Sequence, residues 1–249
     1  MKRLLSLSKT LLATAALTAL VTSAVHAQGG INLSWTDCGS FGTMQKNFAC
    51  NVNTGASTIV GSAISPDSIP AMVAMAAVLD LQTNQATLSP WFDFSTTGCR
   101  SASLSGDFNF TSSTFSCNDI WNGHASGGID YGAGVGGPNR GRFRLVCAVA
   151  APLAVDDVTE NYYFKVTFNN QKTTGTGNCA GCTDGACIVF NSIELDQNPG
   201  VPHAVNKFSN PLDRQYVLWQ GGGGSVDGGC PAAVPTKNAT WGSVKSLYR

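Results

Sequence analysis

Apolar and polar residues alternate with a period of two along much of the chain, which is the pattern of strands that bury one face. The segments that follow this pattern are residues 31–37, 101–110, 140–149 and 161–170. Residues 187–197 and 214–220 add two more predicted strands, bounded by Gly, Asn and Pro. The clearest is 161–170, whose apolar face is predicted to hold Tyr162, Phe164, Val166 and Phe168. Strands are therefore expected to dominate the structure.

Residues 71–82 are ambiguous, because their many alanines also suit a helix. The residues with helical spacing are Met72, Met75, Ala76 and Leu79. The residues that alternate are Val73, Met75, Ala77, Leu79 and Leu81. Because the segment is short, we favour a strand.

About seven strands separated by turn signals, with no convincing amphipathic helix, predict an all-β protein. The expected fold is an antiparallel β-sandwich, jelly-roll-like and stabilised by disulfides. Two glycine-rich segments, 126–141 and 221–229, are expected to be surface loops. No fixed-period repeat and no linker divides the chain, so one domain is predicted over residues 28–249.

The first 27 residues have the organisation of a secretory signal peptide. Lys2, Arg3 and Lys9 precede an apolar stretch over 11–25, and small residues mark a cleavage site after Ala27. The apolar stretch is shorter than the roughly 20 residues that a membrane-spanning helix needs. The protein is therefore expected to be secreted or periplasmic, with no membrane span after cleavage.

The charge of the predicted mature chain does not suit nucleic-acid binding. Of 15 basic and 15 acidic residues, three basic ones lie in the predicted signal peptide, which leaves 12 against 15. Nucleic-acid binding needs a dense basic surface, so nucleic acid is not expected to be a partner.

All nine cysteines follow the predicted signal peptide, where an oxidising compartment favours disulfides. The candidates for pairing are Cys38, Cys50, Cys99, Cys117, Cys179, Cys182, Cys187 and Cys230. Spacing favours Cys38 with Cys50 and Cys99 with Cys117, because each pair brackets a short segment. Since nine is odd, one thiol remains, and Cys147 is expected to be buried on the apolar side of a strand.

Residues 178–187 read NCAGCTDGAC, which raises the question of metal, haem or redox chemistry. Thr183 follows the second cysteine, which excludes the C-x-x-C-H haem motif. Zinc lacks a fourth ligand at suitable spacing, and a redox pair lacks a strand-to-helix setting. We therefore expect a disulfide-bonded loop, no metal and no cofactor.

Motifs for catalysis are largely missing from the sequence. Gly132, Gly134 and Gly137 fit the G-x-G-x-x-G pattern, but Pro138 follows where a nucleotide-binding helix would begin. No G-x-S-x-G or H-E-x-x-H motif occurs. A carboxylate pair made of the only two glutamates, Glu160 and Glu194, is the remaining enzymatic alternative, a glycan-cleaving hydrolase.

Binding residues are predicted in two polar, turn-like settings. Trp91 lies beside Asp93, and Trp121 follows Asp119. An exposed aromatic ring can cover the apolar face of a sugar while neighbouring polar groups bond its hydroxyls, so these four are the candidate ligand-binding residues. The acidic loop residues could also bind calcium, although their spacing matches no EF-hand: Asp119, Asp130, Asp184 and Asp227.

Three segments of the mature chain carry a resemblance. They are CIVFNSIELDQ, the RQYVLWQ strand with its glycine-rich loop and Cys230-Pro231, and the terminal ATWGSVKSLYR. Together they resemble a group of secreted bacterial proteins to which no function is attached. The resemblance implies export and a single domain, and it transfers no site residue.

The sequence therefore favours a secreted, non-catalytic binding module for extracellular carbohydrate or cell-surface material. A structural or adhesive envelope protein that self-associates is an alternative, because the charge is low and the cysteine number is odd.

Overall fold

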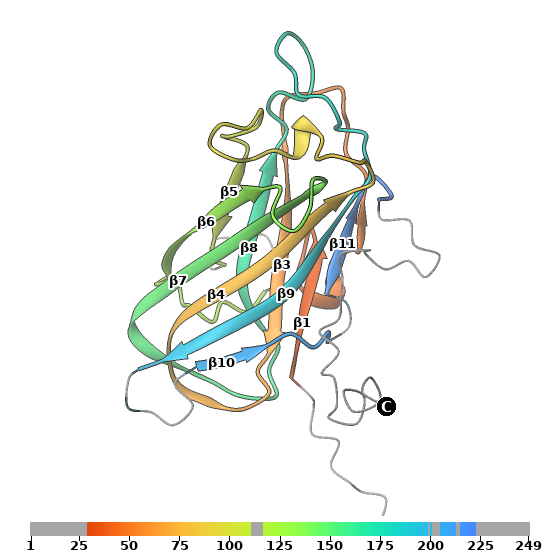
Figure 1. Ribbon diagram of the computed structural model, residues 1–249. Coiled ribbons are helices and arrows are strands. Elements are labelled where there is room, and N and C mark those ends of the chain that lie inside the picture. Colours follow the sequence, from red (N-terminus) through yellow and green to blue (C-terminus); the bar gives the residue numbers. More distant parts are fainter. Residues whose placement is uncertain (1–28, 111–116, 199, 201–204, 213–214, 223–249) are drawn as a thin grey trace, which may run out of the picture.

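The computed structural model describes residues 29–110, 117–198, 200, 205–212 and 215–222 (Figure 1). Strands make up 51% of the structure and helices 3%, which confirms the all-β class. Within the described part of the chain, no helix is long and apolar enough to cross a membrane. The predicted signal peptide and the terminal WGSVKSLYR lie outside the described residues.

The smaller sheet has four antiparallel strands in the order β1-β3-β8-β5. Their bounds are β1 Gly30–Trp35, β3 Ala56–Ile64, β8 Asn161–Asn169 and β5 Leu104–Asp107. Alternation along β3 sends Ile59 and Ala63 into the main core, whereas Val60 and Ser62 take the outer face.

The larger sheet has the order β2-β11-β9-β4-β7-β6, and β10 pairs with the other half of β9. The bounds are β2 Gln45–Lys46, β4 Ile69–Thr83, β6 Ser126–Ala133, β7 Arg140–Val155, β9 Ala186–Gln197, β10 Val205–Phe208 and β11 Tyr216–Trp219. All pairs are antiparallel except β11 with β2, so this sheet is mixed. The short 3-10 helices are η1 Gly39–Phe41 and η2 Pro90–Phe92.

The two sheets stack face to face around one core, as Figure 1 shows with β4, β7 and β9 in front of β3 and β8. Aromatic contacts cross between the sheets, with ring centroids 5.1 Å apart for Phe164 and Phe190 and 5.8 Å apart for Phe143 and Phe168. The chain changes sheets at nearly every connection between β1 and β9. The predicted disulfide-stabilised, jelly-roll-like sandwich is confirmed.

Residues 71–82 form most of β4, so the strand that we favoured there is correct. The core receives Met75, Ala77, Leu79 and Leu81 as predicted. Val73 does not join them, because a register shift between Met72 and Ala74 turns Met72 into the core instead.

A bulge also changes which face of β8 one tyrosine uses. The register between β3 and β8 shifts at Gly61 and Ser62, leaving Tyr163 opposite no partner. Tyr163 therefore joins the main core, and Tyr162 turns to the outer face of the small sheet. The predicted placement of Tyr162 beside Phe164 is wrong, because alternation cannot show a bulge.

The glycine-rich segment 126–141 is not simply a loop. Its first half is β6, which forms a hairpin with β7. Glycine suits this hairpin at Gly127 of β6 and Gly141 of β7, because a Cβ at either position would overlap atoms of the paired strand. Of the second glycine-rich segment, 221–229, only Gly221 and Gly222 lie within the described residues.

Three disulfides join residues that are far apart in sequence: Cys38–Cys117, Cys50–Cys182 and Cys99–Cys179. The predicted pairs Cys38–Cys50 and Cys99–Cys117 are therefore wrong, because spacing along the chain does not show which loops the fold brings together. Cys187 is also disulfide-bonded. Cys230 lies outside the described residues.

Cys147 is the unpaired cysteine of the described residues, and it is buried in the core face of β7 as predicted. Burial raises the pKa of its thiol to about 12. Because the thiolate is the reactive form, native Cys147 should not react with alkylating reagents near pH 8.

We therefore expect iodoacetamide at pH 8 to leave Cys147 unlabelled in the native protein and to label it after unfolding in urea without reductant. Peptide mass spectrometry would locate the label on Cys147. Equal labelling rates in both states would contradict its burial.

Gly61 is expected to tolerate no side chain, because a Cβ there would overlap the ring of Phe164 in the core. Gly61→Ala should lower the free energy of unfolding by about 1–3 kcal/mol through overpacking. Gly128→Ala is the matched control, since a Cβ at Gly128 meets nothing within 4 Å. Urea unfolding of both variants would test this, and equal losses would contradict it.

Candidate functional site

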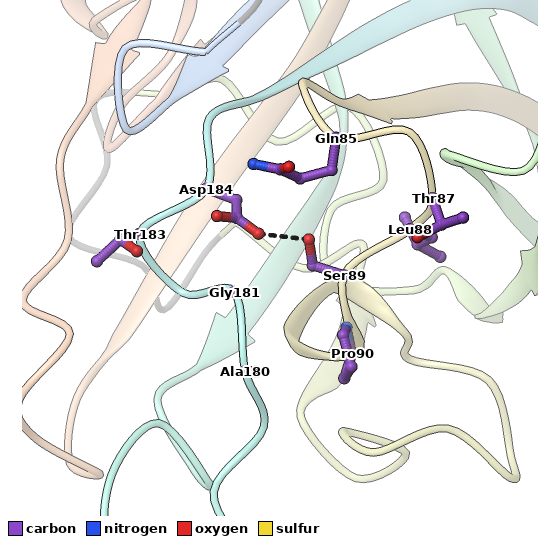
Figure 2. A pocket seen from close by; sticks show the side chains of 9 residues that line it. All are labelled: Gln85, Thr87, Leu88, Ser89, Pro90, Ala180, Gly181, Thr183 and Asp184. Atoms are coloured by element: carbon purple, nitrogen blue, oxygen red, sulfur yellow. Dashed lines mark hydrogen bonds between the residues drawn. The ribbon is translucent and has the colours of Figure 1, made fainter.

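A pocket of about 430 Å³ opens at the end of the sandwich where β4 finishes (Figure 2). Two loops line it, residues 85–90 on one side and 180–184 on the other. Its polar lining residues are Gln85, Thr87, Ser89, Thr183 and Asp184, and its apolar ones are Leu88, Pro90, Ala180 and Gly181. The pocket therefore offers amide, hydroxyl and carboxylate groups to a ligand.

One hydrogen bond connects the two loops across the base of the pocket. The Ser89 hydroxyl donates to Asp184 Oδ2 over 2.5 Å, as Figure 2 shows. Gly181 allows this approach, because it has a φ of +101° and a Cβ there would lie 2.8 Å from Asp184 Oδ2. The other carboxylate oxygen of Asp184 has no protein donor among the hydrogen bonds of the described residues.

Backbone hydrogen bonds fix the loop 85–90 from both sides. Leu88 N donates to Pro138 O of the β6–β7 turn over 2.8 Å, and Trp91 N donates to Ala180 O over 2.9 Å. Asn84 N also donates to Gly185 O over 2.9 Å. The loop is therefore held in place before any ligand arrives.

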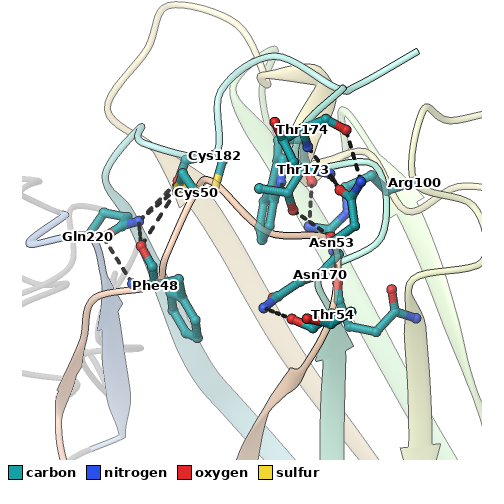
Figure 3. The surroundings of a disulfide bond; sticks show 12 residues. Phe48, Cys50, Asn53, Thr54, Arg100, Asn170, Thr173, Thr174, Cys182 and Gln220 are labelled. Atoms are coloured by element: carbon teal, nitrogen blue, oxygen red, sulfur yellow. Dashed lines mark hydrogen bonds between the residues drawn. A yellow bond between two sulfur atoms is a disulfide. The ribbon is translucent and has the colours of Figure 1, made fainter. Parts of the chain in front are cut away.

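The NCAGCTDGAC segment forms the other wall, and two disulfides tether it as expected for a disulfide-bonded loop. Cys179 bonds Cys99 near the end of η2, and Cys182 bonds Cys50. Figure 3 shows Gln220 beside the Cys50–Cys182 bridge, where its Nε2 donates to Phe48 O over 2.9 Å. The tethers restrict the loop that carries Thr183 and Asp184.

A buried arginine supports the floor behind the pocket. The Arg100 guanidinium lies 3.5 Å from the centroid of the Trp91 ring, and its Nη1 donates to Trp91 O over 3.3 Å. Burial lowers the pKa of Arg100 to about 9. Thr173, which Figure 3 shows near Arg100, accepts a hydrogen bond from Trp91 Nε1 over 3.2 Å. Trp91 is thus packed from several sides.

The predicted aromatic surface for sugars is wrong, because Trp91 and Trp121 are both completely buried. Trp121 Nε1 donates to Tyr163 O near the start of β8, whereas Trp91 lies beside Thr173 just after its end. The two tryptophans are therefore core residues at different ends of the sandwich. Neighbouring polar residues do not reveal this burial in the sequence.

Asp93 and Asp119, the polar partners predicted for those tryptophans, stabilise their own turns. Asp93 Oδ1 accepts from the amide and hydroxyl of Ser95, and Asp119 accepts from the amides of Trp121 and Gly123. These contacts are local, so neither carboxylate is brought to the pocket. Of the acidic residues considered for calcium, Asp184 lines the pocket, Asp119 and Asp130 do not, and Asp227 lies outside the described residues.

Glu160 and Glu194 do not form a carboxylate pair. Glu160 Oε1 accepts from Ser62 Oγ over 2.6 Å on the outer face of the small sheet. Glu194 lies on the outer face of the large sheet, 3.6 Å from Lys207 Nζ on β10. The sandwich core separates them, so a glycosidase built on both side chains is excluded by the geometry.

Asp37, Cys38 and Cys117 come close enough together to resemble a metal site. However, Cys38 and Cys117 are bonded to each other, and disulfide sulfurs do not act as thiolate ligands. Burial raises the pKa of Tyr162 to about 12, and the negative charges of Glu160 and Asp37 contribute to this rise. Two acidic groups therefore share this outer face of the small sheet.

Comparison with protein-family models and with curated proteins finds no match to this chain. The resemblance to secreted bacterial proteins therefore remains a prediction. The disulfides are consistent with an extracellular or periplasmic protein.

Gly181→Ala should lower the free energy of unfolding through two effects, strain at a positive φ and a clash of the new Cβ with Ser89 and Asp184. Gly177→Ala is the matched control, because Gly177 also has a positive φ, +78°, but a Cβ there meets nothing within 4 Å. We expect about 1 kcal/mol of lost stability at Gly177 and about 1–3 kcal/mol more at Gly181. Urea unfolding of both variants would measure this, and equal losses would show that the Ser89–Asp184 contact can relax.

Proposed function

We propose that this protein is a secreted or periplasmic, non-catalytic module that binds carbohydrate in the pocket between residues 85–90 and 180–184. The observation that carries the proposal is a pocket with a polar, pre-positioned lining at the loop end of a disulfide-tethered sandwich. Cleavage near Ala27 would deliver the protein outside the cytoplasm, where such ligands occur.

The size and lining of the pocket support a sugar-sized ligand. Its volume of about 430 Å³ lies within the range of small-molecule sites. Hydroxyl groups of a sugar can donate to Asp184 and accept from the Gln85 amide, while Leu88 and Pro90 offer apolar contact. Because both loops are already fixed, binding would cost little ordering entropy.

Two features favour binding over hydrolysis and over disulfide-linked assembly. Asp184 is the one carboxylate among the described lining residues, whereas glycoside hydrolysis generally needs two. Cys147 is buried and cannot link two chains without unfolding. Self-association remains an alternative proposal, but the odd number of cysteines no longer supports it.

Mature protein from Gln28 onward, made in an oxidising compartment, should bind at least one member of a panel of soluble and insoluble polysaccharides without releasing reducing ends. Asp184→Asn should weaken this binding by about tenfold or more, because it removes a charge-assisted hydrogen bond. Calorimetry or intrinsic tryptophan fluorescence would measure the affinity.

Asp67→Asn is the matched control, because Asp67 lies in the β3–β4 turn at the opposite end of the sandwich. Its affinity should equal that of the wild type. No binding across the panel, or an Asp184→Asn protein that binds as well as the wild type, would contradict the proposal. Release of reducing ends would instead indicate a hydrolase.

A further inference from the structure

A second polar site lies on the outer face of the small sheet, away from the pocket. Asn32 of β1, Ser62 of β3 and Glu160 before β8 meet there. Glu160 Oε1 accepts from Asn32 Nδ2 over 3.2 Å and from Ser62 Oγ over 2.6 Å. Three strands thus converge on one carboxylate.

The carbonyl oxygen of Asn32 has no partner in this site. Asn32 is 1% exposed, and its Oδ1 is buried without a hydrogen bond, although its Nδ2 faces Glu160. A buried acceptor is normally paired, so the unpaired oxygen of the amide that contacts Glu160 is open to a donor or a cation. Amide and carboxylate oxygens are both ligands that hard cations prefer.

The charge of Glu160 is not balanced by a neighbouring base. None of the ion pairs among the described residues involves Glu160, and its two side-chain donors are neutral. Glu160 is half-buried, so solvent reaches the site. The nearest basic residue of this face along β8, Lys165, is 2.7 Å from Asp107 and is already engaged.

The loop after β1 covers the site and adds a second acidic residue. Gly39 has a φ of +48°, and a Cβ there would lie 2.9 Å from Glu160 Oε2. Glycine thus leaves room beside the carboxylate. Asp37 lies in the same loop, which the Cys38–Cys117 disulfide and the Ser34 hydroxyl bond to Asp37 O fix in place.

We propose that Glu160 and Asn32 bind a hard divalent cation of the calcium type, with Ser62 and the Asp37 loop completing the site. The cation would connect β1, β8 and the loop over residues 37–42, and so stabilise one edge of the small sheet. This site is independent of the carbohydrate pocket, and neither proposal requires the other.

Calcium titration of chelator-treated protein tests the inference by calorimetry and by thermal unfolding. Wild type should bind with an affinity near the range of extracellular calcium modules, about 10⁻⁴–10⁻³ M, and its Tm should rise with calcium. Glu160→Gln should lose about tenfold or more in affinity, because ligand charge sets calcium affinity. Glu194→Gln, which removes the other glutamate from the opposite sheet, should bind like the wild type.

The Asn32→Asp variant tests whether Asn32 is a cation ligand or has only a structural role. The added carboxylate should lower Tm in the absence of calcium, because it lies beside Glu160, and should increase calcium affinity. A structural role alone predicts the loss without the gain. The variant also keeps the proposal testable if Glu160→Gln does not fold.

Three results would overturn the inference. The first is no binding by the wild type up to about 10 mM calcium, which is well above that affinity range. The second is equal calcium binding by Glu160→Gln and the wild type. The third is an Asn32→Asp protein whose lost stability calcium does not restore. Any of them would mean that Glu160 and Asn32 do not form a cation site.

Discussion

Trp219, at the end of β11, makes the aromatic contacts that connect the two sheets with the segment behind the pocket. It lies 5.5 Å from Trp35 of the small sheet and 4.6 Å from Trp91 behind the pocket loop, between ring centroids. Phe48 stacks on it at 3.7 Å, close to the Cys50–Cys182 bridge. Each such aromatic pair contributes about 0.5–1.5 kcal/mol beyond area burial. The position of the pocket walls therefore follows from the packing of the core.

The two outer faces of the sandwich differ from its core in how they handle polar groups. Asp80, on the outer face of the large sheet, accepts two bonds from Arg142 and one from Asn191, so its charge is fully paired. The carboxylate of Glu160, on the other outer face, has only neutral donors. The two carboxylates thus differ in how far their charge is compensated, and Glu160 is the one whose hydrogen-bond donors are all neutral.

Strands could be predicted from the sequence because alternation is a local property. It located β7 and β8 and resolved the ambiguity over β4. The face of Tyr162, the strand β6 and the disulfide partners could not be predicted, because each depends on the register between distant segments. The pocket could not be predicted from the sequence for the same reason. NCAGCTDGAC was recognised as a bonded loop, but nothing in the sequence places Ser89 opposite Asp184, and polar neighbours gave a misleading indication of exposure for Trp91.

The disulfides also constrain the order in which the chain can fold. Their sequence separations are 79, 132 and 80 residues, and the strands that lie between the bonded cysteines alternate between sheets. Contacts of such long range form slowly, because a large loop must close before any of them is gained. Cys50 cannot pair with Cys182 until the chain beyond β8 is available. Oxidation would then convert a late-forming topology into one that resists reopening.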